Sequence, residues 1–116
     1  MKIGIVGLGL MGGSFGRTLV KSGEHTVYGK DISDSVMLKA EMLKAINYPL
    51  TFDNAKELDM LILAVTPDKV EGILKEYLPL LKKGAVVTDF CGIKRQTVSL
   101  MREFAKKFEG IWFIGG

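Results

Sequence analysis

The sequence predicts an α/β fold in which a doubly wound parallel sheet carries helices on both faces. Short apolar runs typical of strands alternate along the chain with stretches of helical period, the pattern that repeated βαβ units produce. The run at residues 60–65 is apolar throughout, as expected for a parallel strand covered on both sides. With 116 residues, 47% of them hydrophobic, the chain has the size of one domain with a substantial core.

The first half of the chain predicts strands at residues 3–6 and 25–29, with a further candidate at 49–52. One helix is expected from about residue 10 to 22, where Gly23 would end it. Ser33 could cap a second helix that runs to about Ile46, with three inward side chains: Met37, Ala40 and Leu43.

The second half predicts strands at residues 60–65, 85–89 and 111–114. A helix should begin at Thr66-Pro67-Asp68, which offers a capping hydroxyl, a proline at the first helical position and an acid in the first turn. Its apolar stripe includes Ile73, Leu74 and Tyr77, and Pro79 should break it near its end. A last helix is expected at about residues 96–108, with four inward side chains: Val98, Met101, Ala105 and Phe108.

Composition argues against several classes of function. The net charge is only +3, and no basic stripe with interleaved aromatic residues indicates nucleic-acid binding. A single cysteine and a single histidine exclude an internal disulfide and a His/Cys metal site, and they suit a reducing, cytoplasmic setting. The uncharged stretch at residues 3–16 holds six glycines and is too short to span a membrane, so we expect neither a signal peptide nor a membrane anchor.

The segment from Gly7 to Gly12 reads GLGLMG and matches the GxGxxG pattern of Rossmann dinucleotide-binding folds. It follows a predicted strand and opens a predicted helix, which is the context that the motif requires. Gly7 would allow the tight turn, Gly9 the approach of a pyrophosphate, and Gly12 close packing of helix on strand. The backbone N–H groups near Leu10 and Met11 would point at the phosphates. The alternative is a glycine-rich turn without a ligand.

Asp31 lies 24 residues after Gly7, at the end of the second predicted strand. A carboxylate there can accept both ribose hydroxyls, which favours NAD over NADP because it would repel a 2′-phosphate. The alternative is that Asp31 caps the helix near Ser33. Lys30 could tolerate a 2′-phosphate, but strand alternation should direct its side chain to the opposite face from Asp31.

Further candidates follow the later strands at the same carboxyl edge of the sheet. Val65 and Thr66 should border the cofactor, although Thr66 could equally serve only as a helix cap. Lys94 could face an anionic substrate or be a solvated lysine at a helix start. Cys91 is interpreted as a packing residue, and His25 is expected at the edge opposite the ligand. No catalytic residue is assigned from these patterns.

Taken together, these motifs resemble the prephenate dehydrogenase family over the whole chain. The segments that carry the resemblance are the glycine motif with its extension Gly13-Ser14, Tyr28-Gly29-Lys30-Asp31, Ala64-Val65-Thr66-Pro67, Thr88-Asp89 with Ile93-Lys94, and Phe113-Ile114-Gly115-Gly116. Many members have a serine where this chain has Gly92, which puts a polar contact from that position in doubt, while Lys94 keeps its place.

The resemblance implies the NAD-binding domain, residues 1–116, of an enzyme that oxidatively decarboxylates prephenate (or arogenate) in tyrosine biosynthesis. In that family the last motif continues into His-Pro, whose histidine is the catalytic base, and a mostly helical domain follows that completes the substrate site and forms a homodimer. We therefore expect this chain to be inactive by itself.

Two other functions remain open at the level of sequence. A 3-hydroxyacid dehydrogenase or a pyrroline-carboxylate reductase would share the glycine motif and an apolar strand such as residues 60–65. A free-standing nucleotide-sensing module is the non-enzyme alternative. The sequence that follows Gly116 in the gene would distinguish them.

Overall fold

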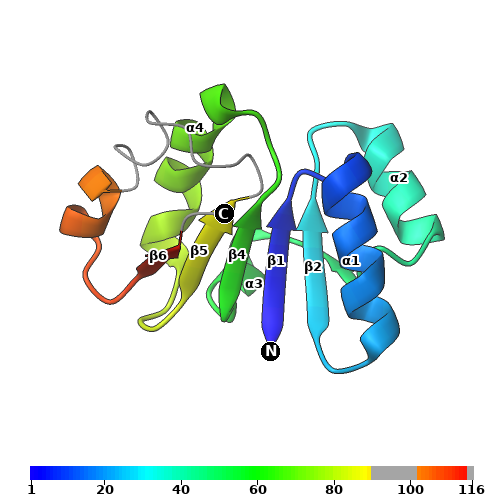
Figure 1. Cartoon of the computed structure of the whole chain (residues 1–116), viewed down its shortest axis with the longest axis horizontal. Helices are drawn as coiled ribbons and strands as arrows, with labels where there is room; N and C mark the ends of the chain where they lie inside the picture. The colour runs from blue at the N-terminus through cyan, green and yellow to red at the C-terminus, as the bar shows by residue number, and fades with distance from the viewer. Residues whose placement is uncertain (90–101, 115–116) are drawn as a thin grey trace.

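A six-stranded, entirely parallel sheet forms the centre of the computed structural model, which describes residues 1–89 and 102–114 (Figure 1). The strand order is β3-β2-β1-β4-β5-β6, so the first strand lies in the middle and the chain winds outward in both directions. The strands are β1 (Lys2–Val6), β2 (Thr26–Lys30), β3 (Tyr48–Pro49), β4 (Met60–Leu63), β5 (Val86–Asp89) and β6 (Trp112–Ile114). The predicted doubly wound α/β class is confirmed.

Helices cover both faces of this sheet, as predicted. They are α1 (Leu10–Ser22), α2 (Asp34–Met42), α3 (Phe52–Ala55), α4 (Pro67–Tyr77) and the 3₁₀ helix η1 (Leu78–Leu80), and residues 102–107 are also helical. Side chains of α1 and α2 pack with Ile3, Ile5 and Ile62 in one apolar cluster. Side chains of α3, α4 and the 102–107 helix pack in a second cluster with Leu61 and Leu63.

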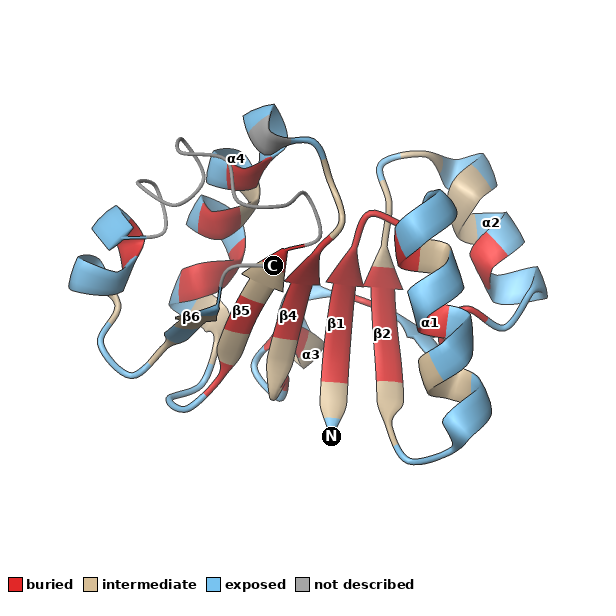
Figure 2. Ribbon diagram, viewed as in Figure 1, coloured by how far each residue is buried: buried red, intermediate tan, exposed pale blue. Residues whose placement is uncertain are grey.

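Alternation along the central strands produces these two clusters. Ile62 faces α1 and α2, whereas its neighbours Leu61 and Leu63 face α4, and all three are at most 2% exposed. Burying each such side chain contributes roughly 1.5–3 kcal/mol. Figure 2 shows the resulting buried core of the sheet, which runs through β1 and β4. The sheet is therefore a rigid platform whose carboxyl ends all point to one edge.

Helix α2 ends at Met42, so the prediction that it continues to about Ile46 is wrong. Lys44 adopts a left-handed backbone with φ of 56°. The Ala45 N–H then donates to the Ala40 carbonyl at 2.8 Å, and the Lys44 N–H donates to that of Glu41 at 3.2 Å. This is a Schellman ending, which needs the left-handed residue. Leu43 consequently points outward and is 45% exposed.

The candidate strand at residues 49–52 is also only partly correct. Strand β3 is limited to Tyr48–Pro49, and Phe52 already belongs to the short helix α3. Thr51 and Asn54 form a reciprocal capping box at its start, in which each side chain accepts a hydrogen bond from the other's backbone N–H. These two hydrogen bonds favour a helical turn over a longer edge strand at these residues.

Two later helices test the predictions for the second half. Helix α4 gives way to η1 at Leu78, and Pro79 lies inside that 3₁₀ turn, so the predicted break is confirmed. In the last predicted helix, Phe108 packs against the second cluster as predicted, but Ala105 is exposed, and Phe104, which is 7% exposed, faces inward in its place. Phe104 stacks on Phe108 with 6.3 Å between ring centroids. Val98 and Met101 lie outside the described residues.

A carboxylate ties three segments together at the amino-terminal edge of the sheet. Asp59 accepts a hydrogen bond from the Lys2 backbone N–H and one from the Lys82 ammonium, each at 2.7 Å. These hydrogen bonds, with that of Lys82 contributing most, hold the pKa of Asp59 below its usual value. The start of β1, the start of β4 and the turn before β5 are thereby fixed at the edge opposite the glycine loop.

We predict that Lys44→Gly stabilises the protein by about 1 kcal/mol, because glycine adopts the left-handed backbone without the strain of a Cβ. Chemical denaturation of the variant and the wild type measures the difference. Lys39→Gly is the matched control, since Lys39 is an exposed residue inside α2 and should lose about 1 kcal/mol. A destabilised Lys44→Gly variant would contradict this account of the helix end.

Candidate cofactor-binding site

The turn between β1 and α1 is held in place by two glycines that the fold itself requires. Gly7 has φ of 97°, and a Cβ there would collide with the Ala64 carbonyl oxygen at the end of β4. A Cβ on Gly12 would collide with the Gly7 carbonyl oxygen. These close approaches seat the start of α1 directly over the ends of β1 and β4, as the motif predicts.

Gly9 differs from these two glycines, because apart from its own chain neighbours no atom lies within 4 Å of the position that a Cβ would take. Its φ of −67° is negative, so no left-handed backbone calls for glycine here. The absent side chain leaves an open approach to the first turn of α1. That turn has no side-chain cap and no acidic residue, so its N–H groups and the positive end of the helix dipole face this approach.

Leu10 and Met11 follow in that turn, and their side chains point to solvent, with exposures of 92% and 63%. Any role in binding a phosphate would therefore come from their backbone N–H groups, as the sequence analysis expects. The geometry suits a pyrophosphate, which needs close backbone approach and several N–H donors.

Asp31, directly after β2, links the glycine loop to the start of α2. Its Oδ2 accepts a hydrogen bond from the Leu8 N–H at 2.8 Å, and its Oδ1 accepts one from the Ser33 N–H at 2.9 Å. Ser33 is itself the N-cap of α2, so Asp31 does not cap the helix directly. Each carboxylate oxygen keeps a second acceptor site for another donor.

A cavity of about 610 Å³ opens at the carboxyl edge of the sheet, between the glycine loop, the end of β2 and helix α4. It brings together five of the predicted site residues: Gly7, Gly9, Asp31, Val65 and Thr66. The side chains of Ile32 and Ile73 add apolar surface. Gly12 and the side chains of Leu10 and Met11 do not line it, and Lys94, Cys91 and Gly92 lie outside the described residues.

Thr66 occupies the N-cap position of α4, but its hydroxyl makes no capping hydrogen bond, so its predicted role as a capping hydroxyl is wrong. A hydrogen bond with Thr66 instead lowers the pKa of the exposed Asp68 below its usual value. Both residues border the cavity. The Thr66 hydroxyl therefore donates to the carboxylate in the first turn of α4 and accepts no hydrogen bond from the backbone there.

Lys30 and Tyr77 line the same cavity, which the sequence pattern does not predict. Lys30 does turn toward α3 and α4, and its ammonium lies 5.2 Å from the ring centroid of Phe52 and 5.9 Å from that of Tyr77. Burial raises the pKa of Tyr77, while the adjacent positive charge of Lys30 acts in the opposite direction. The sequence predicts Tyr77 only as part of an apolar stripe, and no sequence signal separates it from its core neighbours.

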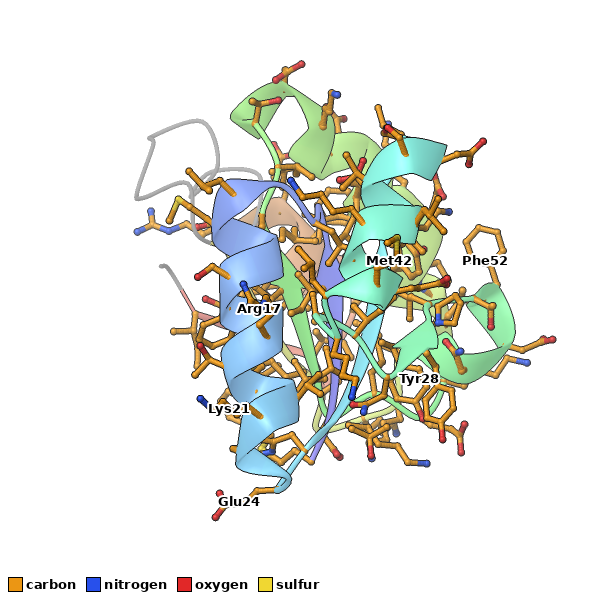
Figure 3. The ribbon with its side chains drawn as sticks, turned by 90° about the vertical axis from the view of Figure 1, so that its right-hand side faces the viewer. Arg17, Lys21, Glu24, Tyr28, Met42 and Phe52 are labelled. Carbon is orange, nitrogen blue, oxygen red and sulfur yellow. The ribbon has the colours of Figure 1, made fainter. Side chains whose placement is uncertain are left out.

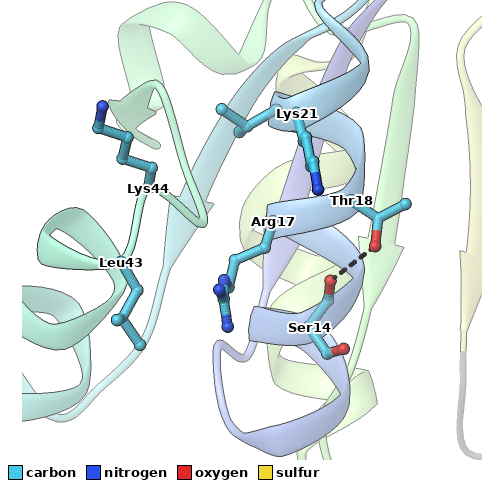
Figure 4. A pocket seen from close by; sticks show the side chains of 7 residues that line it. Ser14, Arg17, Thr18, Lys21, Leu43 and Lys44 are labelled. Atoms are coloured by element: carbon cyan, nitrogen blue, oxygen red, sulfur yellow. Dashed lines mark hydrogen bonds between the residues drawn. The ribbon is translucent and has the colours of Figure 1, made fainter.

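A second depression, of about 520 Å³, lies between α1 and the turn after α2. Figure 3 shows Arg17 and Lys21 along α1, and in Figure 4 the Arg17 side chain points toward Leu43 across the depression. Thr18 donates a hydrogen bond to the Ser14 carbonyl there at 3.2 Å. None of the predicted cofactor-binding residues lines this surface.

The described residues outside the cavity add little chemistry. His25 lies at the amino-terminal edge of the sheet, with Nδ1 3.4 Å from the terminal amine of Met1, as the prediction places it. Within residues 1–89 and 102–114, no three His, Cys, Asp or Glu side chains gather as a metal site. In the same ranges, no helix has the length and apolarity needed to cross a membrane.

Comparison with known proteins gives a consistent result. The model of the family described as "prephenate dehydrogenase, nucleotide-binding domain" matches residues 15–116. Arogenate dehydrogenase from Synechocystis is similar in structure, with a TM-score of 0.83 at 25% identity over 99% of this chain and 40% of that one. Prephenate dehydrogenase from A. aeolicus, solved with hydroxyphenyl propionate and NAD⁺, has a TM-score of 0.82 at 28% identity over 99% and 40%.

Fold similarity extends further, to 3-hydroxyisobutyrate dehydrogenase from Mycobacterium tuberculosis, with a TM-score of 0.81 at 23% identity over 98% of this chain and 39% of that one. At this identity the likeness concerns the fold alone. The chain spans about 40% of the length of the structures it matches. Among curated proteins, none matches the sequence.

We predict that Gly9→Ala weakens NAD binding at least tenfold while leaving the free energy of unfolding unchanged or raised by up to about 1 kcal/mol. The new methyl group would occupy the approach to the α1 N-terminus but would touch no protein atom within 4 Å. Calorimetric titration and chemical denaturation measure the two quantities.

Gly12→Ala is the contrasting variant, because its methyl group meets backbone and should destabilise the fold itself. Unimpaired NAD binding by Gly9→Ala would show that the open space at this position is not where the cofactor lies.

Proposed function

The chain belongs to the prephenate dehydrogenase family, and we propose that it is the NAD-binding domain of an enzyme that oxidatively decarboxylates prephenate to 4-hydroxyphenylpyruvate. The observation that carries the proposal is the open approach at Gly9, beside an uncapped helix terminus, in a chain of this family. The NAD⁺ held by the related A. aeolicus structure supports the choice of cofactor. The reaction would belong to tyrosine biosynthesis in the cytoplasm.

The residues of this chain would bind and orient the dinucleotide. The α1 N-terminus, reached past Gly9, would hold the pyrophosphate through backbone N–H groups. Asp31 would accept the hydroxyls of the adenosine ribose at its remaining acceptor sites, and Val65 and Thr66 would border the nucleotide along the end of β4. When bound, NAD supplies the hydride acceptor for the substrate ring carbon.

Residues 1–116 would then form one domain of a larger active site. The only histidine of the chain, His25, lies at the edge opposite the cavity, so the catalytic base would come from elsewhere in the protein. A further, mostly helical domain would complete the substrate site and the homodimer, and Lys94 would contact the substrate carboxylate. Arogenate is the second candidate substrate, because the Synechocystis relative is an arogenate dehydrogenase.

We predict that the wild type binds NAD at least tenfold more tightly than NADP and that Asp31→Ser removes most of this preference. The carboxylate supplies charge-assisted hydrogen bonds to ribose hydroxyls, each worth roughly 1.5–3 kcal/mol, and it repels a 2′-phosphate. Titration of both nucleotides into both proteins measures the preference. Asp34→Ser is the control, since Asp34 is an acid of the α2 first turn that does not line the cavity.

Equal affinity of the wild type for the two nucleotides, or an undiminished preference in Asp31→Ser, would refute the role of Asp31. The reaction itself is tested by supplying prephenate and arogenate, each with NAD, to the protein extended by whatever follows Gly116 in its gene. If neither prephenate nor arogenate leads to the formation of NADH, the proposed activity is refuted.

A further inference from the structure

A hydroxyl group without a hydrogen-bond partner lies at the inner end of the cofactor cavity. Tyr77 is 2% exposed, and among the described residues its hydroxyl has no hydrogen-bond partner of good geometry. The Lys30 ammonium beside it is itself a donor, so the proton of the hydroxyl is left without an acceptor. Its ring packs against that of Phe52, with 5.6 Å between centroids, and the Lys30 ammonium lies over both rings. Within the described ranges, no carboxylate forms a salt bridge with Lys30.

This arrangement is costly if the cavity stays empty. A buried hydroxyl without a partner loses its hydrogen bonds to water and gains none in return. Phenylalanine would fill the same space without that cost. The Tyr77 hydroxyl and the Lys30 ammonium are both hydrogen-bond donors, so a ligand group with acceptor atoms would satisfy them.

The shape and lining of the cavity indicate which group that is. Its mouth carries the apolar side chains of Ile32, Val65 and Ile73, of which Ile32 is 84% exposed. Asp31, proposed to hold the ribose, borders the same cavity, so the group attached to that ribose would lie in it. Adenine has two apolar faces for such a mouth and ring nitrogens that accept hydrogen bonds.

We infer that Tyr77 and Lys30 recognise the adenine base of the cofactor: the Tyr77 hydroxyl donates to a ring nitrogen, and the Lys30 ammonium lies beside the same edge. Glu76, an exposed carboxylate on the cavity rim, is placed to accept from the amino group of the base. The inference rests on the proposed binding of NAD and names two residues that select its base.

Recognition of a 2′-phosphate by Lys30 is the competing interpretation. Two observations disfavour it. The ammonium is directed over the rings of Phe52 and Tyr77, whereas Asp31 faces the glycine loop. The cavity lining also carries three carboxylates, Asp31, Asp68 and Glu76, against two lysines, Lys30 and Lys69, and this net negative charge disfavours a further dianion.

Tyr77→Phe tests the inference directly. We expect its affinity for NAD and for ADP to fall about three- to tenfold, the usual loss for one hydrogen bond, and its weak affinity for nicotinamide mononucleotide to stay unchanged. Without nucleotide, the variant should melt no lower than the wild type, because the substitution removes only a hydroxyl without a partner. Tyr48→Phe is the matched control, since Tyr48 is 56% exposed and does not line the cavity.

Lys30→Met should lower the affinity for NAD and ADP in the same way, with Lys75→Met, an exposed lysine of α4 outside the cavity, as its control. Unchanged affinity of Tyr77→Phe for NAD, alongside normal binding by the wild type, would overturn this inference and leave the proposed cofactor standing. A loss in Lys30→Met confined to NADP would also overturn it. Failure of the wild type to bind NAD would overturn both proposals.

Discussion

The close packing of α1 against the ends of β1 and β4 is the contact on which the rest of the structure depends. It requires hydrogen atoms in place of side chains at Gly7 and Gly12, because a Cβ at either residue would meet a backbone carbonyl oxygen. β1 and β4 are neighbours at the middle of the sheet, where the winding direction reverses. A ligand crevice forms at such a reversal because the helices that follow the two strands diverge to opposite faces.

Two consecutive residues at the end of β2, Lys30 and Asp31, contact opposite sides of this crevice. Asp31 reaches the glycine loop through the Leu8 N–H, and Lys30 reaches the aromatic rings beneath α4. Consecutive side chains of an extended chain point to opposite sides, so two neighbouring residues can reach these two different places. One short segment thereby presents an acceptor toward the glycine loop, where we propose that the ribose lies, and a donor toward the rings of Phe52 and Tyr77.

Features that depend on local pattern could be predicted from the sequence, and features that depend on tertiary contacts could not. The apolar strands and the glycine motif gave the sheet, the covered faces and the residues at the carboxyl edge, because parallel strands of one sheet end together. Lys44 carries no residue-type signal for a left-handed backbone, so the end of α2 was misplaced. The Thr51–Asn54 capping box is a local pattern, although a strand is the structure predicted for that segment.

The candidate site shows the same division. Gly7, Gly9, Asp31, Val65 and Thr66 meet in one cavity, as their positions after strands predict. The prediction that Tyr77 belongs to an inward stripe is confirmed. Its buried hydroxyl, unlike the side chains of its apolar neighbours, needs a hydrogen-bond partner, and only the arrangement of α4 over Lys30 reveals this. The Thr66 hydroxyl likewise depends on a choice between a backbone N–H and the Asp68 carboxylate that residue order alone does not decide.

The carboxylate at the far edge of the sheet determines how the fold responds to acid. Because the folded protein holds the pKa of Asp59 below its ordinary value of 3.8, ionised Asp59 stabilises the fold above that value. This contribution is lost as the pH falls through the lower pKa of the folded state. Protonation would loosen the start of β1 and the Lys82 turn first, so acid would act on the sheet from the edge farthest from the nucleotide cavity.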